Sequence, residues 1–546
     1  MARPMSVRGG WIRTMPRLAA LLAIALLAPL ALDSQSASAT GYATVISHGS
    51  TTRPAVALTF DDGWTGSGAL RIARILVAKD ARATFFPYGA AVLQSPAIFD
   101  WIARQPNFEI ANHTATHDIL CRVTSGGCVS TGVSPFREIK GGRTIVAGIT
   151  GRAMLPVLRP PGGNYNASVR AASLASGFPR MVLWNVTAAD TVARTSGTVR
   201  TRIAKAGNGA IILAHMGPTT TMAALPGAID DLRAKGLSLV TLSELLRLTP
   251  EPGQPAQDYV TGGFGPPGVG PRWQPSEALD AAGHRHLAWT SPDGVWYATD
   301  ASGTWVGEQV AASIAGSEYF EQPSLRLVGG AVTIALTDET ETASVVMIAT
   351  RAVDGWTMAT VPGQHGFASM PSLAISGSDL YLAYREQGPW SPATRTWPKQ
   401  GLYLATRKSG TWTTERFSRE AGDQNPSVAV DPVTHRPVVA FRARSASGVL
   451  PLGTYLAIRS TTSWSYTRIT AREAYPSLRI SASRRRHVLL ADALSTRLLA
   501  GSAVPGHAFS FRTVGFGVQA SLVKPGRAVA TTISSSRHSA LREFGY

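Results

Sequence analysis

The first half of the chain is organised around one stretch, Val56-Ala57-Leu58-Thr59-Phe60-Asp61-Asp62-Gly63. Its first five residues predict a short buried strand, because a largely apolar run of this length fits a strand that is covered on both faces. Two carboxylates and a glycine follow where the strand would end. Side chains alternate along a strand, but the chain turns at its end, so both carboxylates can reach one pocket. A turn with two solvated carboxylates is the alternative interpretation.

Strand-like and helical patterns alternate after this stretch. Further strands are expected at residues 83–86, 181–186 and 210–214, and helices at 68–78, 98–103, 223–234 and 242–248. Such alternation is typical of an α/β domain whose strands form a parallel sheet or barrel. The sequence therefore predicts an α/β domain over residues 40–250.

Three histidines are candidates for the chemistry of this domain. His113 and His117 are four residues apart, and on a helical turn this spacing would place both imidazoles on one face, within reach of one cation. With Asp62 the pair offers two nitrogens and one oxygen, and leaves positions open for water and substrate, as hydrolytic zinc sites require. His215 ends the apolar run at 210–214, where it could act as a general acid. Surface or structural histidines are the alternative for all three.

Together these features resemble the ordered motifs of the polysaccharide deacetylase family, which is carbohydrate esterase family four, or the NodB-homology domain. Four of the motifs match, at residues 59–63, 113–117, 159–163 and 213–215. The resemblance covers about residues 53–250 and implies a distorted (β/α) barrel of the NodB type. It also implies a hydrolase that removes N-acetyl groups from an amino-sugar polysaccharide, peptidoglycan or a chitin-like polymer, and releases acetate.

The resemblance implies a role for each matched residue. Asp61 would be the general base, and Arg159 would pair with it and orient it. A divalent metal, with Zn²⁺ the expected ion, would be held by Asp62, His113 and His117. His215 would protonate the departing amine. The pocket would be completed by a backbone N–H near Gly162, which would help to hold the oxyanion, and by Leu213, which would line the space for the acetyl methyl group.

The fourth motif departs from the family pattern Asp-x-x-Asp-Trp. Thr187 and Thr191 stand in place of its first Asp and its Trp, whereas Asp190 remains and corresponds to the residue that orients the acid histidine. The change puts the identity of the substrate in doubt more than the reaction. A catalytically inactive carbohydrate-binding or wall-binding protein is the second functional hypothesis, although every principal catalytic position is filled.

Cys121 and Cys128 are the two cysteines of the chain, so a disulfide-rich scaffold and a four-cysteine zinc module are excluded. In an exported protein a disulfide between them is the default expectation. Cys121 also follows His117 by four residues, so a fourth metal ligand is the alternative, but a thiolate would close the site.

The first 39 residues have the pattern of a secretory signal peptide. Four arginines precede an apolar run at residues 18–32, and Ala37-Ser38-Ala39 fits a small-residue cleavage site. The apolar run is shorter than the roughly 20 residues that span a bilayer, so a retained anchor is the weaker interpretation. We expect a mature protein that is secreted, either extracellular or associated with the cell wall, with no transmembrane segment.

The net charge is +18, and the charge that remains after residues 1–39 are removed is still strongly positive. A basic balance favours an anionic surface such as a cell-wall polymer, and solubility alone is the simpler explanation. Export argues against nucleic acid as a partner.

The second half of the chain follows a Pro/Gly-rich segment, residues 251–272, which is expected to be a linker. Over residues 273–546, Pro-Ser or Ala-Ser begins a strand-like run six times, at 275, 323, 371, 426, 476 and 520, and several of the units carry a Trp before their last strand. Four short strands repeated about every 50 residues are typical of a β-propeller. We therefore expect an all-β propeller of about six repeats and five to seven blades.

A sialidase-like glycosidase seated in this propeller is a third functional hypothesis, but the spacing around Trp305 differs from the repeats of that family.

Overall fold

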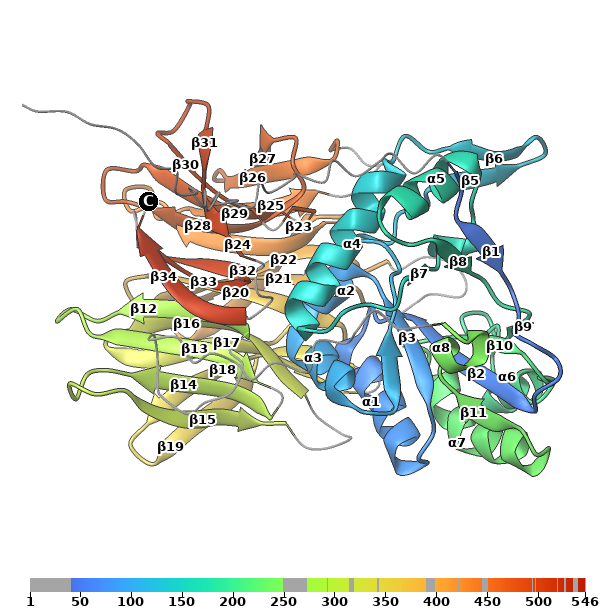
Figure 1. The fold of residues 1–546 in the computed structure, drawn as a ribbon. Helices are drawn as coiled ribbons and strands as arrows, with labels where there is room; N and C mark the ends of the chain where they lie inside the picture. Colours follow the sequence, from blue (N-terminus) through green and yellow to red (C-terminus); the bar gives the residue numbers. More distant parts are fainter. Residues whose placement is uncertain are drawn as a thin grey trace, which may run out of the picture. The chain divides into compact units, whose positions relative to one another are not determined.

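Parallel strands and the helices that connect them form the N-terminal part of the computed structural model (Figure 1). The structure describes residues 41–248 and 273–545, apart from gaps at 292, 314–318, 341–342, 389–397, 421–422, 444–449, 493, 496, 518, 525–526 and 534–538. The expected signal peptide and almost all of the expected linker lie outside the described residues. Among the described residues, no helix combines the length and apolar character that a membrane crossing needs. The boundaries 40–250, 251–272 and 273–546 stay predictions.

The central strand, β2 (Ala55–Asp62), is buried along its whole length. It belongs to a parallel sheet with the order β4-β3-β2-β10-β9, and β11 also pairs with β2. A second parallel sheet has the order β1-β8-β7. The other strands are β1 (Thr44–Ile46), β3 (Ala83–Pro87), β4 (Phe108–Ile110), β7 (Val157–Leu158), β8 (Arg180–Val182), β9 (Val186–Thr187), β10 (Ile211–His215) and β11 (Ser238–Val240). The predicted parallel α/β domain is confirmed, and closure into a barrel stays a prediction.

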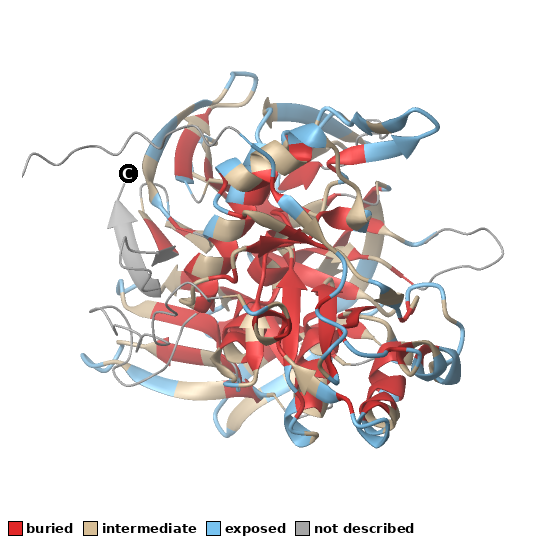
Figure 2. Cartoon of the chain, turned by 45° about the vertical axis from the view of Figure 1, so that its right-hand side comes forward, coloured by how far each residue is buried: buried red, intermediate tan, exposed pale blue. Residues whose placement is uncertain are grey.

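Eight α-helices lie between or after these strands in the described part of the chain. They are α1 (Gly66–Ala78), α2 (Gly89–Gln94), α3 (Pro96–Arg104), α4 (Pro135–Thr150), α5 (Ala167–Ala175), α6 (Ser196–Ile203), α7 (Thr219–Ala234) and α8 (Leu242–Leu246). The four predicted helices correspond to α1, α3, α7 and α8. In Figure 2 buried residues are concentrated on the strands that these helices cover.

One predicted strand, residues 181–186, is wrong as a single element, because the structure divides it into β8 and β9. Side-chain hydrogen bonds occur at this interruption. Asn185 accepts a hydrogen bond from the Ile211 N–H through Oδ1 at 2.9 Å, and Arg159 donates to the Leu183 carbonyl at 3.2 Å. Arg159 is one of the candidate site residues, so the interruption adjoins the candidate site.

The C-terminal part is a ring of antiparallel sheets that resembles a five-blade β-propeller, with a sixth, three-stranded sheet between the last blade and the first. The sheets are β12–β15 (Trp273–Leu279, Arg285–Ser291, Gly294–Thr299, Val306–Ala312), β16–β19 (Tyr319–Val328, Ala331–Glu339, Ser344–Ala352, Gly355–Thr360), β20–β23 (Ala368–Ser376, Asp379–Glu386, Gly401–Lys408, Thr411–Ser418), β24–β27 (Gln424–Val430, Pro437–Ala443, Gly453–Arg459, Trp464–Thr470), β28–β31 (Ala474–Ile480, Arg486–Asp492, Arg497–Ala503, Ser510–Phe516) and β32–β34 (Gln519–Lys524, Arg527–Ile533, Ser539–Gly545). Strand β32 contacts both β12 and β28, so the ring is closed. The predicted propeller is confirmed.

Repeated residues join neighbouring sheets of this propeller. The ring of Trp356 in β19 meets Tyr297 of the preceding blade edge-to-face at 5.5 Å, and the ring of Trp464 lies 4.9 Å from that of Phe417. Aromatic contacts of this kind bury large apolar areas between sheets that could not each cover both faces alone.

The α/β domain and the propeller lie in one compact unit, residues 40–546, and share buried residues. Trp273 and Tyr319 of the propeller belong to the core of the α/β domain. The carbonyl of Gln94, at the end of α2, accepts hydrogen bonds from the side-chain amides of Gln274 at 2.7 Å and Gln322 at 3.2 Å. The propeller thus supplies donors to helix carbonyls that would otherwise lack partners.

Buried carboxyl groups at this junction make it sensitive to pH. Glu321 accepts a hydrogen bond from the Ser95 hydroxyl at 3.2 Å. Burial, reinforced by the charge of Glu339, raises the pKa of Glu321 well above its ordinary value. The unfolded chain titrates this carboxyl at the ordinary pKa. Protonated Glu321 therefore makes its full contribution to stability below the ordinary pKa. This contribution is lost as the pH rises through the higher pKa of the folded state.

Replacing Glu321 by Gln is expected to raise the free energy of unfolding at pH 8 by at least about 1 kcal/mol, since the amide carries no charge to desolvate. The gain should shrink towards pH 4.5. Thermal unfolding between these two pH values checks this, with Glu308→Gln as the control, since Glu308 is a partly exposed carboxylate paired with Arg351. A gain that does not vary with pH would show that Glu321 is not the group that titrates.

Candidate active site

Asp61 and Asp62, at the carboxyl end of β2, reach two different sets of partners. Asp62 has a φ of +77° and Gly63 a φ of +88°. The left-handed backbone breaks the alternation of the strand, so that adjacent carboxylates serve one site. Both are buried, with 3% and 6% of their surfaces exposed. The sequence-based expectation that the two carboxylates come together agrees with this geometry, and a solvated turn does not.

The two histidines of the second motif meet, but not on a helical turn, and that expectation is wrong. Residues 111–119 form a loop in which Thr114 and His117 have φ values of +71° and +65°. The imidazole centroids are nevertheless 5.0 Å apart. His113 is almost fully buried, whereas 35% of the His117 side chain is exposed.

Helix α4 holds this loop in place. Glu138 on the helix accepts hydrogen bonds from the N–H and the hydroxyl of Thr116, both at 2.9 Å. Gly142 lets the helix approach, because a Cβ there would lie 2.5 Å from the carbonyl carbon of Thr114. The loop conformation is therefore imposed by a helix that the sequence analysis did not predict, and its Ser134-Pro135 start is the signal that could have revealed it.

Asp62, His113 and His117 form a cluster whose potential ligand atoms all lie within 4.8 Å of one another. The Nε2 atoms of His113 and His117 are 3.2 Å and 3.0 Å from Oδ1 of Asp62. Among the residues that the structure describes, none forms a hydrogen bond with this buried oxygen. His113 Nδ1 donates a hydrogen bond to the carbonyl of Arg159 at 2.7 Å. This bond leaves Nε2 as the nitrogen that can bind a metal.

The electrostatics of this cluster favour a positive charge between its three members. Burial alone would raise the pKa of Asp62, but His113 and His117 lower it. Burial alone would lower the pKa of His113, but Asp61 and Asp62 raise it. Two imidazoles and one carboxylate with an unsatisfied oxygen fit a divalent cation, which would take the place of the protons.

Arg159 is fully buried and fixes Asp61. Its Nη1 donates to Oδ1 of Asp61 at 2.7 Å and to the hydroxyl of Thr59 at 2.9 Å, and its Nε donates to the carbonyl of Val182 at 3.0 Å. The guanidinium also lies over the ring of Phe86, 4.2 Å from the centroid. With so many partners the arginine cannot move, and it holds the carboxylate in one orientation.

His215 ends β10 directly beside Asp61, since the two residues are register partners in the parallel pair of β10 and β2. Asp190 accepts from its Nδ1 at 2.8 Å and from its backbone N–H at 2.7 Å, and also from the hydroxyl of Thr221 at 2.6 Å. Burial would lower the pKa of His215, but Asp190, together with Asp61 and Asp62, raises it to about 9. Asp190 thus engages Nδ1, and Nε2 is the ring nitrogen that remains for another partner.

Leu213 and Gly162 are the remaining predicted residues. Leu213 is buried in β10 and pairs with Thr59 of β2. Gly162 is exposed and has a φ of +66°. Two aromatic residues were not predicted, namely Trp64, whose ring lies 6.2 Å from that of His215, and Tyr88, whose ring lies 5.4 Å from that of His117.

The predicted disulfide between Cys121 and Cys128 is confirmed. It joins the two strands of a hairpin, β5 (Cys121–Thr124) and β6 (Gly127–Ser130), that follows the histidine loop. Cys121 is consequently not available as a fourth metal ligand. The hairpin and its crosslink restrain the loop from its C-terminal side.

Comparison with known proteins agrees with the motifs. Residues 48–180 match the family model of polysaccharide deacetylases. The peptidoglycan-N-acetylglucosamine deacetylase PgdA of Listeria monocytogenes is 29% identical over 195 residues, which are 36% of this chain and 39% of PgdA, so the chain spans about two fifths of the length of that relative.

Two solved structures resemble the same region. The peptidoglycan deacetylase PdaC from Bacillus subtilis is 29% identical, with a TM-score of 0.31, over 36% of this chain and 91% of that one. A CE4 family pseudoenzyme from Bacillus anthracis is 23% identical, with a TM-score of 0.34, over 38% and 71% of the two chains. By its family match, the region of this chain that carries Asp61, Asp62, His113, His117 and Arg159 is a polysaccharide deacetylase domain of carbohydrate esterase family four.

Proposed function

We propose that the chain is a secreted, metal-dependent deacetylase that hydrolyses N-acetyl groups of an amino-sugar polysaccharide and releases acetate. The observation that carries the proposal is the meeting of Asp61, the Asp62–His113–His117 cluster and His215 at the carboxyl ends of β2 and β10. Such an edge is where parallel α/β folds place their reactive groups. Export is supported by the basic and apolar pattern of residues 1–39.

Asp62, His113 and His117 would hold the ion, for which we propose Zn²⁺, because imidazole and carboxylate ligands with open positions suit zinc. When bound, it would supply Lewis acidity towards the acetyl carbonyl and the attacking water. Arg159 keeps Asp61 fixed through the 2.7 Å hydrogen bond, so that Asp61 can accept the proton of the water. A backbone N–H near Gly162 would stabilise the oxyanion.

His215 would provide the proton on the other side of the scissile bond. As the bond between the carbonyl carbon and nitrogen breaks, the nitrogen takes a proton from Nε2 and leaves as an amine. Asp190 orients the ring through Nδ1 and keeps it protonated near neutral pH. Leu213 would line the space for the acetyl methyl group. Acetate and an amino sugar are then the products.

We propose peptidoglycan or a chitin-like polymer as the substrate class. Relatives of the domain are named as peptidoglycan deacetylases, and the basic charge suits an anionic wall polymer.

An inactive carbohydrate-binding protein is the second candidate. It is favoured by the departure at Thr187, which is exposed and accepts a hydrogen bond from the N–H of Ala189 instead of offering a carboxylate.

Acetate release by the mature protein is the decisive measurement. It would be made with added Zn²⁺ on chitooligosaccharides and on peptidoglycan, with a chelator control and with Asp61→Asn alongside. Release that the chelator and the substitution both abolish would support the deacetylase, and the preferred polymer would name its substrate class. No release from either polymer by protein with bound metal would favour the binding protein.

Replacing Asp190 by Asn is expected to move the high-pH limb of the pH–rate profile to lower pH. The neutral amide no longer stabilises the imidazolium, so the pKa of His215 falls and its acid form is lost earlier as the pH rises. At pH 8 we expect about a tenfold or greater loss of kcat/KM, and a smaller loss at pH 6.

Rates between pH 5 and pH 10 test this, with Asp231→Asn as the matched control, since Asp231 pairs with Arg200 on the surface. Equal losses at every pH would mean that Asp190 only positions the ring.

A further inference from the structure

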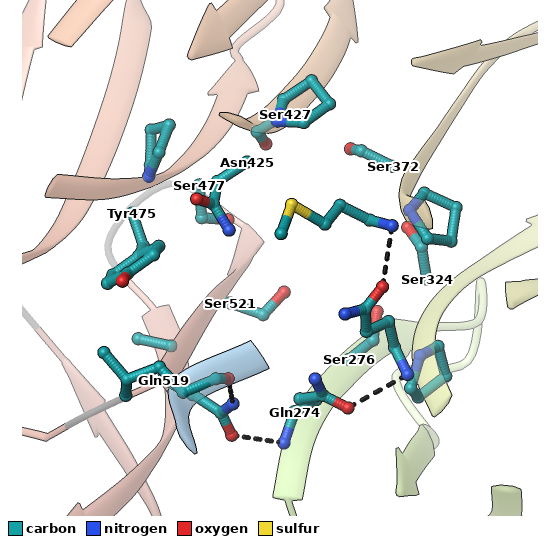
Figure 3. A pocket seen from close by; sticks show the side chains of 18 of the residues that line it. Gln274, Ser276, Ser324, Ser372, Asn425, Ser427, Tyr475, Ser477, Gln519 and Ser521 are labelled. Carbon is teal, nitrogen blue, oxygen red and sulfur yellow. Dashed lines mark hydrogen bonds between the residues drawn. The ribbon is translucent and has the colours of Figure 1, made fainter. Parts of the chain in front are cut away.

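A cavity of about 210 Å³ lies along the axis of the propeller; it contains none of the residues of the Asp62–His113–His117 cluster, but Tyr88, whose ring is next to that of His117, is part of its lining. All six sheets line it, each with the first residues of its first strand, so the six Pro-Ser and Ala-Ser repeats of the sequence meet around one space (Figure 3). Residues 88, 90, 93 and 94 of the α/β domain line it as well. Nothing in the proposed deacetylation uses this cavity.

The serines of the repeats are arranged to donate hydrogen bonds. In five of them Oγ accepts from a backbone N–H of the next sheet at 2.9–3.0 Å, namely in Ser276, Ser324, Ser372, Ser427 and Ser477. A hydroxyl that accepts in this way keeps its own proton for another acceptor. Within the described part of the chain no residue accepts a hydrogen bond from these five hydroxyls. Figure 3 shows them distributed around the cavity.

Two arginines add positive charge to the same lining. Arg326 and Arg479 each stand two residues after the serine of their repeat, in the second and fifth sheets of the ring, which are opposite one another among six. Burial, and after it the positive charge of Arg479, lowers the pKa of Arg326 well below its ordinary value. The described residues that line the cavity include no Asp or Glu.

The equivalent positions of the other four sheets are small or apolar: Ala278, Ala374, Ala429 and Val523. They leave space at the level of the arginines. Arg326 donates to the Leu325 carbonyl at 2.5 Å and Arg479 to the Leu478 carbonyl at 2.9 Å. A guanidinium has five N–H donors, so one such bond does not exhaust it, and an anion between the two groups would offset their partly buried positive charges. Guanidinium groups and hydroxyl donors are the groups that bind oxyanions in proteins, often through two hydrogen bonds to one phosphate or carboxylate.

We propose that the axial cavity of the propeller is a binding site for a small oxyanion, a phosphate or carboxylate group, held by Arg326, Arg479 and the ring of serine hydroxyls. The volume suits a group of a few heavy atoms up to a small organic acid. The site would make the propeller a ligand-binding module.

Calorimetric titration of the full mature protein with inorganic phosphate and, separately, with malonate tests the proposal. Ionic strength would be matched with chloride. We expect saturable binding of at least one of the two anions, and a rise of the thermal midpoint by about 2–4 °C at saturation. Preference for phosphate would indicate a phosphorylated ligand, and preference for malonate a carboxylated one. Binding of neither anion would overturn the proposal.

The double variant Arg326→Gln/Arg479→Gln should weaken this binding by at least about tenfold. Arg485→Gln, which removes an exposed arginine outside the cavity, should leave it unchanged. Any anion binding at the metal cluster would be the same in the native protein and in these variants. If the double variant bound the anion as tightly as the native protein, the proposal would therefore also be overturned.

The unfolding of the variants without added anion gives a second readout. Because the two arginines repel each other, Arg326→Gln alone should unfold no earlier than the native protein. If this single variant unfolded earlier and kept its affinity for anions, the arginines would be structural. The single variant also provides the binding test if the double variant does not fold.

Discussion

Asp61→Asn is expected to lower acetate release by about 10²–10⁴-fold while metal remains bound. The amide oxygen can still accept the hydrogen bond of Arg159, but it cannot take a proton from water. Asp61 is not part of the Asp62–His113–His117 cluster, so the affinity for metal should change little. Steady-state rates beside the metal content of the purified protein provide the measurement.

A fold control is needed because the substitution leaves the buried guanidinium of Arg159 without its carboxylate. Arg159 keeps its hydrogen bonds to Thr59, Val182 and Leu183, so we expect the protein to remain folded. Thermal unfolding of Asp61→Asn establishes this. A folded, metal-loaded Asp61→Asn with native turnover would reject Asp61 as the base.

His113→Ala is expected to lose bound metal and acetate release together. His113 is the more buried of the two imidazoles, and its Nδ1 contact with the Arg159 carbonyl orients Nε2 towards Asp62. Removing one of three ligands, with the hydrogen bond that orients it, should weaken metal binding by more than about 100-fold. Metal analysis after dialysis, with rates measured in parallel, checks both losses.

His507→Ala is a suitable control, since His507 is exposed in the propeller. Partial recovery of His113→Ala by excess Zn²⁺ would fit weakened binding. Full activity of metal-free His113→Ala would mean that the cluster is not the catalytic centre. Together, His113→Ala and Asp61→Asn separate the groups that hold the ion from the group that moves a proton.

On the acid side of the site, the sequence revealed some of the residues and not others. His215 was recognisable because it ends an apolar strand, and Asp190 because it stands at a motif position. Thr221, which donates to Asp190, was not, since α7 brings it there from 31 residues further along the chain. Trp64 and Tyr88 carry no local pattern that marks them as neighbours of His215 and His117.

In the histidine loop, His113 and His117 meet as expected, but the helical turn that was expected to bring them together is absent from this described loop. A spacing of four residues suggested a helical turn, because that is the regular structure which brings such positions together. The structure uses two left-handed residues instead, and these are stabilised by Glu138 and by the close approach at Gly142. Local spacing cannot reveal a conformation that depends on a helix packed from outside.

By itself, the sequence determined the parallel α/β domain, its motif residues, the disulfide and the six repeats, because each depends on periodicity, short spacing or composition. Tertiary structure decided what these parts form together. Ring closure brings six distant Pro-Ser and Ala-Ser segments around one cavity, and the end of α2 meets the amides of Gln274 and Gln322. Contacts between residues hundreds of positions apart depend on packing and charge summed over the whole fold, and no local stretch of sequence encodes them.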